Sequence, residues 1–185
     1  MKKFELTTDF KMHCGKKLFR IRALIDFGDV KAGDLGGYIE REENLSHDGN
    51  AWVSESAWVS ENARVGGNAH VSESAHVSEN AIVSGNAWVS GNARVSGDAH
   101  VSGDALVSGN ADILWVTGLG TAHRTTTAFR TPDGIRIVCD CFFGDLEQFR
   151  RQVKNTRTGK VQEEYLKFAE LVEIYFGKER VKEEE

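Results

Sequence analysis

Residues 51–113 read AWVSES AWVSEN ARVGGN AHVSES AHVSEN AIVSGN AWVSGN ARVSGD AHVSGD ALVSGN ADI. Every sixth residue from Val53 to Val107 is valine, and Ile113 continues the series. An alanine stands two positions before each of these aliphatic residues. A fixed short period of this kind is typical of a β-solenoid, in which each copy forms one strand and the corner that follows it.

The positions within a copy predict which side chains face the core. Side chains alternate across a strand, so alanine and valine point the same way, which must be inward. The residue between them and the residue after valine then point outward. The corner reads Glu-Ser, Glu-Asn, Gly-Asn or Gly-Asp. Glycine, asparagine and aspartate tolerate the left-handed backbone that a sharp corner needs.

Two degenerate copies precede the regular ones. Ile39 and Leu45 fit the aliphatic position and are six residues apart. From Leu45 to Val53 the spacing is eight, so His47 and Asp48 form a predicted corner insertion of two residues. Counted this way, the solenoid runs from Ile39 to Ile113.

The motif resembles that of the hexapeptide-repeat, left-handed parallel β-helix superfamily, aliphatic-small-x-x-small-x, which reads Val-Ser-Gly-Asn-Ala-x in this chain. The resemblance implies a triangular prism with three copies per turn and a homotrimeric assembly. The left-handed sense comes from the resemblance alone, because the general rule for parallel crossovers favours right-handed connections.

With three copies per turn, residues eighteen positions apart stack on one face of the prism. The outward residues then form three columns: Tyr38, Trp58, His76, Arg94 and Asp112; Asn44, Arg64, Ile82 and His100; and Trp52, His70, Trp88 and Leu106. The third column predicts an exposed apolar stripe, which marks either a subunit interface or a cleft that stacks a planar ligand. The first column is the more polar candidate for a ligand wall, through Trp58, His76 and Arg94.

The flanking segments predict two end pieces. Residues 1–36 form an N-terminal β cap, with a hairpin turning at residues 14–16. The prism covers residues 37–116, a small α+β domain covers 117–177, and 178–185 form a charged tail. In that domain, Thr131-Pro132-Asp133-Gly134 predicts a hairpin turn. Asp145 and Gln148 predict a capping box, and a second helix is expected from Val161 to Phe176.

Composition narrows the classes of function. Residues 1–50 and 113–185 are each neutral, and residues 51–112 hold two Arg and seven acids, so the prism carries the whole net charge of −5. This distribution argues against a nucleic-acid binder, which needs a basic stripe. No apolar run is long enough to span a membrane, and no signal-peptide core follows the N-terminus. We therefore expect a cytoplasmic protein, and three cysteines suit that compartment.

A narrower resemblance rests on GDLGGYIE at residues 33–40, the repeats, ILWVTGLG at 113–120 and CDCF at 139–142. These runs look like those of hexapeptide-repeat proteins found in phages and prophages. The resemblance implies that the protein comes from a phage or prophage and is located in the host cytoplasm. It indicates this context rather than a particular activity.

Several residues are candidates for chemistry. Many hexapeptide-repeat proteins are CoA-dependent acyltransferases in which a histidine is the general base, and His47 in the corner insertion is the positional candidate. Cys139 and Cys141, expected on one face of a strand, lack the ligand spacing of a zinc site and are interpreted as buried thiols. Further candidates for binding an anion are the basic side chains Arg64, Arg94, Arg124, Arg130 and Arg136 and the histidine His100. The alternative is ordinary surface charge.

The leading hypothesis is a non-enzymatic homotrimeric binding protein of phage or prophage origin. It would sequester a small anionic, nucleotide-type ligand and so counter host defence, with no cofactor and no metal. One alternative is an interaction protein whose corner carboxylates at positions 55, 61, 73, 79, 98 and 104 block a basic site on a host protein. The other alternative is acyl transfer from CoA.

Overall fold

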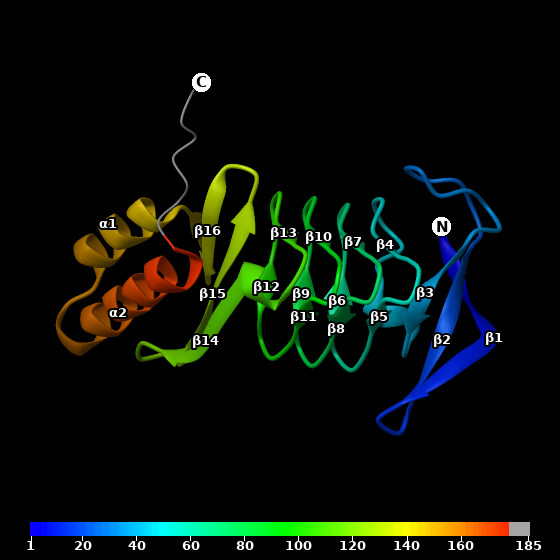
Figure 1. Ribbon diagram of the computed structural model, residues 1–185, viewed down its shortest axis with the longest axis horizontal. Coiled ribbons are helices and arrows are strands. Elements are labelled where there is room, and N and C mark those ends of the chain that lie inside the picture. The colour runs from blue at the N-terminus through cyan, green and yellow to red at the C-terminus, as the bar shows by residue number, and fades with distance from the viewer. Residues whose placement is uncertain (178–185) are drawn as a thin grey trace. The chain divides into compact units, whose positions relative to one another are not determined.

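The computed structural model describes residues 1–177, and the predicted charged tail 178–185 lies outside the described residues. The protein is mainly β. It divides into two compact units, Met1–Asn110 and a second unit from Ala111 onward. The first contains the N-terminal strands and the solenoid, and the second contains an antiparallel sheet and two helices (Figure 1).

The solenoid is a parallel β-solenoid built from strands of two residues each. They are β4 (Trp52–Val53), β5 (Trp58–Val59), β6 (Arg64–Val65), β7 (His70–Val71), β8 (His76–Val77), β9 (Ile82–Val83), β10 (Trp88–Val89), β11 (Arg94–Val95), β12 (His100–Val101) and β13 (Leu106–Val107). They form three parallel stacks, in the orders β5-β8-β11, β4-β7-β10-β13 and β6-β9-β12. The three-copies-per-turn prediction is confirmed, because Trp88 pairs with His70 on one side and Leu106 on the other.

The core of the solenoid contains the two side chains that the repeat predicts. Every alanine and valine at the inward positions of residues 51–107 is at most 1% exposed. Successive turns are joined by backbone hydrogen bonds such as Trp88 N–H to the Ala105 carbonyl, at 2.8 Å. Valine stacks on valine between successive turns, and alanine lies two residues before each valine along the chain, so a narrow interior is filled without polar side chains.

The corners use left-handed backbone, as predicted, but not only through glycine. Gly67, Gly85 and Gly103 have φ between +64° and +68°. Glu73 and Glu79 occupy equivalent corners with φ of +57° and +60°. A non-glycine residue pays a steric cost in this region, so the glutamate corners hold backbone strain that the glycine corners lack.

The N-terminal cap is a hairpin of β1 (Phe4–His13) and β2 (Lys16–Ala23), followed by β3 (Leu35–Ile39). β2 pairs antiparallel with β3, and β3 pairs parallel with β5, so the cap continues one face of the solenoid as a single sheet. A 3₁₀ turn, Glu42–Asn44, leads to Leu45, which bridges Val65 and starts another face. The predicted cap is therefore present and is joined to the solenoid by backbone hydrogen bonds.

The second unit is an antiparallel sheet covered by two helices. Its strands are β14 (Ile113–Leu119), β15 (Arg124–Thr131), β16 (Gly134–Cys139) and β17 (Phe142–Gly144), in sequential order. α1 (Leu146–Thr156) and α2 (Gly159–Phe176) pack against each other and against this sheet (Figure 1). Ile113 pairs antiparallel with Phe129, so the structure differs from the expectation that Ile113 is the last solenoid strand.

The core of this unit forms between the sheet and the helices. Ile137, Phe149, Phe168 and Val172 are all nearly inaccessible to solvent. The predicted capping box is present, since the Asp145 side chain accepts a hydrogen bond from Gln148 N–H at 2.7 Å. In the described part of the chain, no helix is both long and apolar enough to cross a membrane.

Candidate functional site

The face formed by β3, β5, β8 and β11 carries the predicted first column. Tyr38 pairs with Trp58, Trp58 with His76 and His76 with Arg94, each on the neighbouring turn. The rings of Trp58 and His76 are in contact, with centroids 4.3 Å apart. The three predicted ligand residues on this face are therefore brought together.

The cap adds basic side chains to this face that the repeat pattern did not indicate. His13, at the end of β1, lies with its ring centroid 4.5 Å from that of Trp58 and 6.2 Å from that of His76. The Lys11 ammonium lies 4.1 Å from the centre of the Tyr38 ring and donates to the Ser56 carbonyl at 3.0 Å. Both side chains come from the hairpin, whose position over this face depends on its pairing with β3. The local signal was the alternation of Lys11 and His13 with Phe10 and Met12 at the end of β1, which puts both basic side chains on one face of the strand.

The electrostatics of this cluster favour an anion. Burial lowers the pKa of His76, and the positive charges of Arg94, His13 and Lys11 lower it further. Burial also lowers the pKa of Lys11. Four basic side chains, Lys11, His13, His76 and Arg94, therefore lie at one patch that also contains the rings of Tyr38 and Trp58. Such a patch can stack a planar group and neutralise a negative charge beside it.

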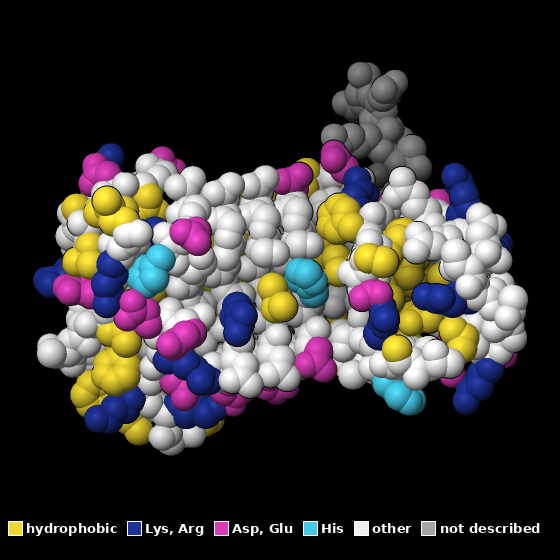
Figure 2. Space-filling model, turned by 180° about the vertical axis from the view of Figure 1, so that it is seen from behind, with side chains coloured by type: hydrophobic (Ala, Val, Ile, Leu, Met, Phe, Trp, Pro, Cys, Tyr) yellow, Lys and Arg dark blue, Asp and Glu magenta, His cyan; other side chains and the backbone are white. Residues whose placement is uncertain are grey.

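The face formed by β6, β9 and β12 carries Arg64, Ile82 and His100 in register. Figure 2 shows a basic, a hydrophobic and a histidine side chain in a row on an otherwise pale solenoid surface. Burial lowers the pKa of His100. Arg64 and His100 lie on a different face from Trp58, His76 and Arg94, so the predicted ligand residues do not form one site. Asn44, expected to extend this column outward, is buried and donates to the Ala63 carbonyl at 2.8 Å.

The face formed by β4, β7, β10 and β13 carries the predicted interface stripe. His70 stacks on Trp88 with centroids 4.8 Å apart, and Trp88 and Leu106 are 51% and 42% exposed. Trp52 departs from the expectation of an exposed stripe. It is 5% exposed because the ring of Phe27 packs edge-on against it at 5.4 Å. The exposed stripe therefore consists of Trp88 and Leu106 together with the partly buried His70.

His47, the candidate general base, is held inside the cap. Its Nδ1 accepts the Lys3 backbone N–H at 3.2 Å, its Nε2 lies 2.7 Å from Glu42 Oε1, and its ring stacks on Phe4 at 4.4 Å. Both ring nitrogens are therefore engaged within the chain, while the partly exposed imidazole also lines a hollow together with Arg64.

The predicted arginine group of the C-terminal unit is split among three places. Arg124 forms an ion pair with Asp140 at one end of β15. Arg130, near the other end, lies 3.1 Å from Asp112 and donates to the Phe176 carbonyl at 3.2 Å, which closes the end of α2. Arg136 is on β16, in a shallow hollow that also contains Asp133 and Glu173. Six strand residues span about 20 Å, so no single anion can contact Arg124 and Arg130 together.

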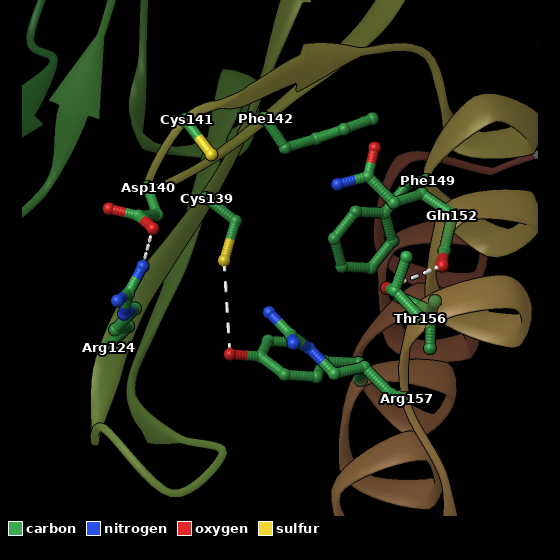
Figure 3. Close-up of a pocket in the computed structure, with 11 residues that line it drawn as sticks. Arg124, Cys139, Asp140, Cys141, Phe142, Phe149, Gln152, Thr156 and Arg157 are labelled. Atoms are coloured by element: carbon green, nitrogen blue, oxygen red, sulfur yellow. Dashed lines mark hydrogen bonds and ion pairs between the residues drawn. The ribbon is translucent and has the colours of Figure 1, made fainter.

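A pocket between the sheet and the helices of this unit contains Arg124 at its edge (Figure 3). Cys139 and Cys141 both line it, but they do not share one strand face as predicted. β16 ends at Cys139, Asp140 turns with φ of +56°, and Cys141 is exposed rather than buried. Among residues 1–177, no three His, Cys, Asp or Glu side chains are grouped in a way that would hold a metal ion.

Comparison with known proteins adds to this picture. Residues 89–103, which include β11 and β12, match a family model described as "YdcK Beta solenoid repeat". The chain matches no curated protein. The matched segment lies within the solenoid, and the stacked strands extend the same pattern on both sides of it. The protein is a β-solenoid of the hexapeptide-repeat type.

Proposed function

We propose that the protein is a non-enzymatic binding protein that sequesters a small, planar, anionic ligand of the nucleotide type at the face of β5, β8 and β11. The observation that carries the proposal is the gathering of Lys11, His13 and Arg94 around the rings of Trp58 and His76. Sequestration requires affinity alone, and this cluster supplies both a stacking surface and positive charge.

The ligand would place its ring system against His76, next to Trp58, and its anionic group toward Arg94. Arginine and a protonated histidine both donate charge-assisted hydrogen bonds to phosphate oxygens. A nucleotide has this combination of a planar base and a phosphate. Arg94 is exposed and His76 is partly exposed, so a ligand can reach both side chains from solvent.

The exposed stripe of His70, Trp88 and Leu106 supports a homotrimer as part of this proposal. Single exposed apolar residues are common, but a stacked Trp and Leu on one straight face form a continuous apolar surface. Burial of that surface against neighbouring copies would leave the face of β5, β8 and β11 at the subunit boundary or open to solvent.

The proposal is tested by isothermal titration calorimetry of the full chain against a panel of nucleotides and acyl-CoAs. We expect nucleotide binding at micromolar concentration. Arg94→Gln and His76→Gln should weaken it by roughly ten- to a hundredfold. Arg64→Gln is the matched control, because Arg64 occupies the same strand position on another face and should leave affinity unchanged. Absence of binding across the panel, or an equal loss in the control, contradicts the proposal.

A second candidate is an interaction protein that contacts a basic partner. The observation that favours it is the exposure of Glu55 and Glu73 on one corner of neighbouring turns. A protein partner captured at low salt and released at higher salt, with Glu55→Gln and Glu73→Gln abolishing capture, would support this candidate instead.

A further inference from the structure

The pocket in the C-terminal unit has an aromatic side. Phe142 lies partly exposed at its edge, and its ring centroid is 5.3 Å from that of Phe149. Phe149 in turn packs edge-on against Tyr165 at 6.1 Å. Val153 completes this wall from the next turn of α1. The pocket therefore offers a surface of aromatic and aliphatic carbon to an apolar group.

Polar side chains also line the pocket, among them Arg124, Arg157 and the largely buried Tyr165. Within residues 1–177, the hydrogen-bond contacts of the Tyr165 hydroxyl are long, at 3.4 Å to the Leu119 carbonyl and 4.0 Å to the Cys139 sulfur. Burial raises the pKa of this hydroxyl and the Cys139 thiol adds to the rise, while Arg157 and Arg124 act in the opposite direction. Both guanidinium groups are thus close enough to influence the same hydroxyl.

The two arginines differ in how their charge is neutralised. Arg124 is paired with Asp140 at the pocket edge (Figure 3). Arg157 is exposed and lines the pocket, and within residues 1–177 no carboxylate is within ion-pair distance of its guanidinium. Its backbone is held by its N–H bond to Val153 and by Gln162, which donates to its carbonyl at 2.6 Å. Among the described residues, the pocket therefore holds one guanidinium that has no carboxylate partner.

We propose that this pocket is a second binding site, independent of the solenoid, for a small organic carboxylate that carries an aromatic or branched apolar group. The carboxylate would accept hydrogen bonds from the Arg157 guanidinium and the Tyr165 hydroxyl. Its apolar group would pack against Phe142 and Phe149. The single uncompensated charge suits a monoanion and disfavours a dianionic phosphate, whose second charge would lack a partner.

The experiment is a titration of the full chain with benzoate, followed by two-dimensional NMR and calorimetry. Benzoate is small, so we expect a dissociation constant of about 1 mM or below. Shifted signals should come from residues that line the pocket. Benzyl alcohol, which lacks the charge, and inorganic phosphate, which lacks the ring, should each bind at least about tenfold more weakly.

Variants separate the site from general surface binding. Arg157→Gln should lower benzoate affinity at least about tenfold, because it removes the charge-assisted hydrogen bond. Tyr165→Phe keeps the ring and should weaken binding about threefold or more. Arg151→Gln is the matched control, since Arg151 is exposed on α1 outside the pocket and should bind benzoate normally.

Three results would overturn the inference. These are absence of benzoate binding at about 10 mM, equal binding of benzyl alcohol or phosphate, and unchanged affinity in the Arg157→Gln variant. The variant's melting temperature is measured in parallel, so that a loss of binding through unfolding is recognised. Failure here leaves the nucleotide proposal untouched, because that proposal is tested by Arg94 and His76 on the solenoid.

Discussion

The buried lysine of the N-terminal cap predicts an unusual dependence of stability on pH. Lys3 is 1% exposed, and its ammonium donates to the carbonyls of Gly49 and Ala51 at 3.2 and 2.9 Å. It also lies 4.8 Å from the centre of the Phe27 ring. Burial lowers the pKa of Lys3 from 10.5 to about 8, against the opposing charge of Asp48. Elsewhere in the solenoid, carbonyls at these positions accept hydrogen bonds from backbone N–H groups of the preceding turn. At the first turn, the Lys3 ammonium takes the place of those donors.

The size and sign of the effect follow from proton linkage. Between about pH 8 and pH 10.5, the folded protein holds fewer protons at Lys3 than the unfolded chain does. The free energy of unfolding therefore rises with pH in that window, by about 3 kcal/mol in total for a shift of this size. Below pH 8 both states are protonated, and the folded state carries the full cost of the buried charge.

Lys3→Met keeps the length of the apolar stem and removes the titrating group. We expect the difference in unfolding free energy, wild type minus variant, to rise by about 3 kcal/mol from about pH 7 to pH 10.5. Equilibrium urea unfolding followed by tryptophan fluorescence measures it, because Trp52 of the first solenoid strand packs against Phe27 of the cap. Other groups that titrate in this range contribute equally to both proteins and cancel in the difference.

Lys2→Met is the matched control for this experiment. Lys2 is half exposed and forms a surface ion pair with Glu42, so its removal should change stability by less than about 1 kcal/mol at every pH. A wild-type minus Lys3→Met difference that stays constant across the pH range, or falls as pH rises, would refute the reasoning.

The remaining predictions concern the corners, the ligand face and the apolar stripe. Gly85→Ala should destabilise the protein by about 1–2 kcal/mol or more, because φ of Gly85 is +68° and an added Cβ would lie 2.6 Å from the Gly103 nitrogen. Glu73→Gly should be neutral or stabilising by up to about 1 kcal/mol, because it relieves a non-glycine residue with φ of +57°. Urea unfolding measures the stability of both variants. Nucleotide affinity measured by calorimetry should increase as pH falls through the lowered pKa of His76, since the protonated ring attracts the anion, and His76→Gln should flatten that dependence. Trp88→Arg should convert an assembled protein to monomers and leave the fold intact, because Trp88 is 51% exposed in the single chain. Native mass spectrometry measures the oligomeric state. An unchanged oligomer mass would exclude this stripe as the interface.

Local pattern determined the solenoid, its corners and much of the C-terminal unit. The six-residue period placed Ala and Val inside, and they are buried as expected. The Thr131–Gly134 turn and the Asp145–Gln148 capping box formed where the sequence predicted them. These features depend on neighbours close in the chain or on a strictly repeated spacing, so the sequence alone contains the information.

The candidate sites depended on contacts between distant segments. The repeat predicted that Trp58, His76 and Arg94 share a face, but the cap brings Lys11 and His13 to it and covers Trp52 with Phe27. No periodicity predicts where a non-repeating hairpin lies on a solenoid, because its position is set by the pairing of β2 with β3.

In the C-terminal unit, the predicted hairpin turn and capping box were confirmed, whereas the predicted arrangements of the cysteines and of the arginines were wrong. A left-handed residue at Asp140 turns the chain between Cys139 and Cys141, and β15 holds Arg124 and Arg130 at opposite ends. Arg157 entered the pocket through the packing of α1 against the sheet, which no local motif encodes. The sequence by itself therefore determined the repeating scaffold and the presence of an N-terminal β cap. Only the tertiary structure decided which charges meet, because burial and long-range pairing, rather than spacing, bring those side chains together.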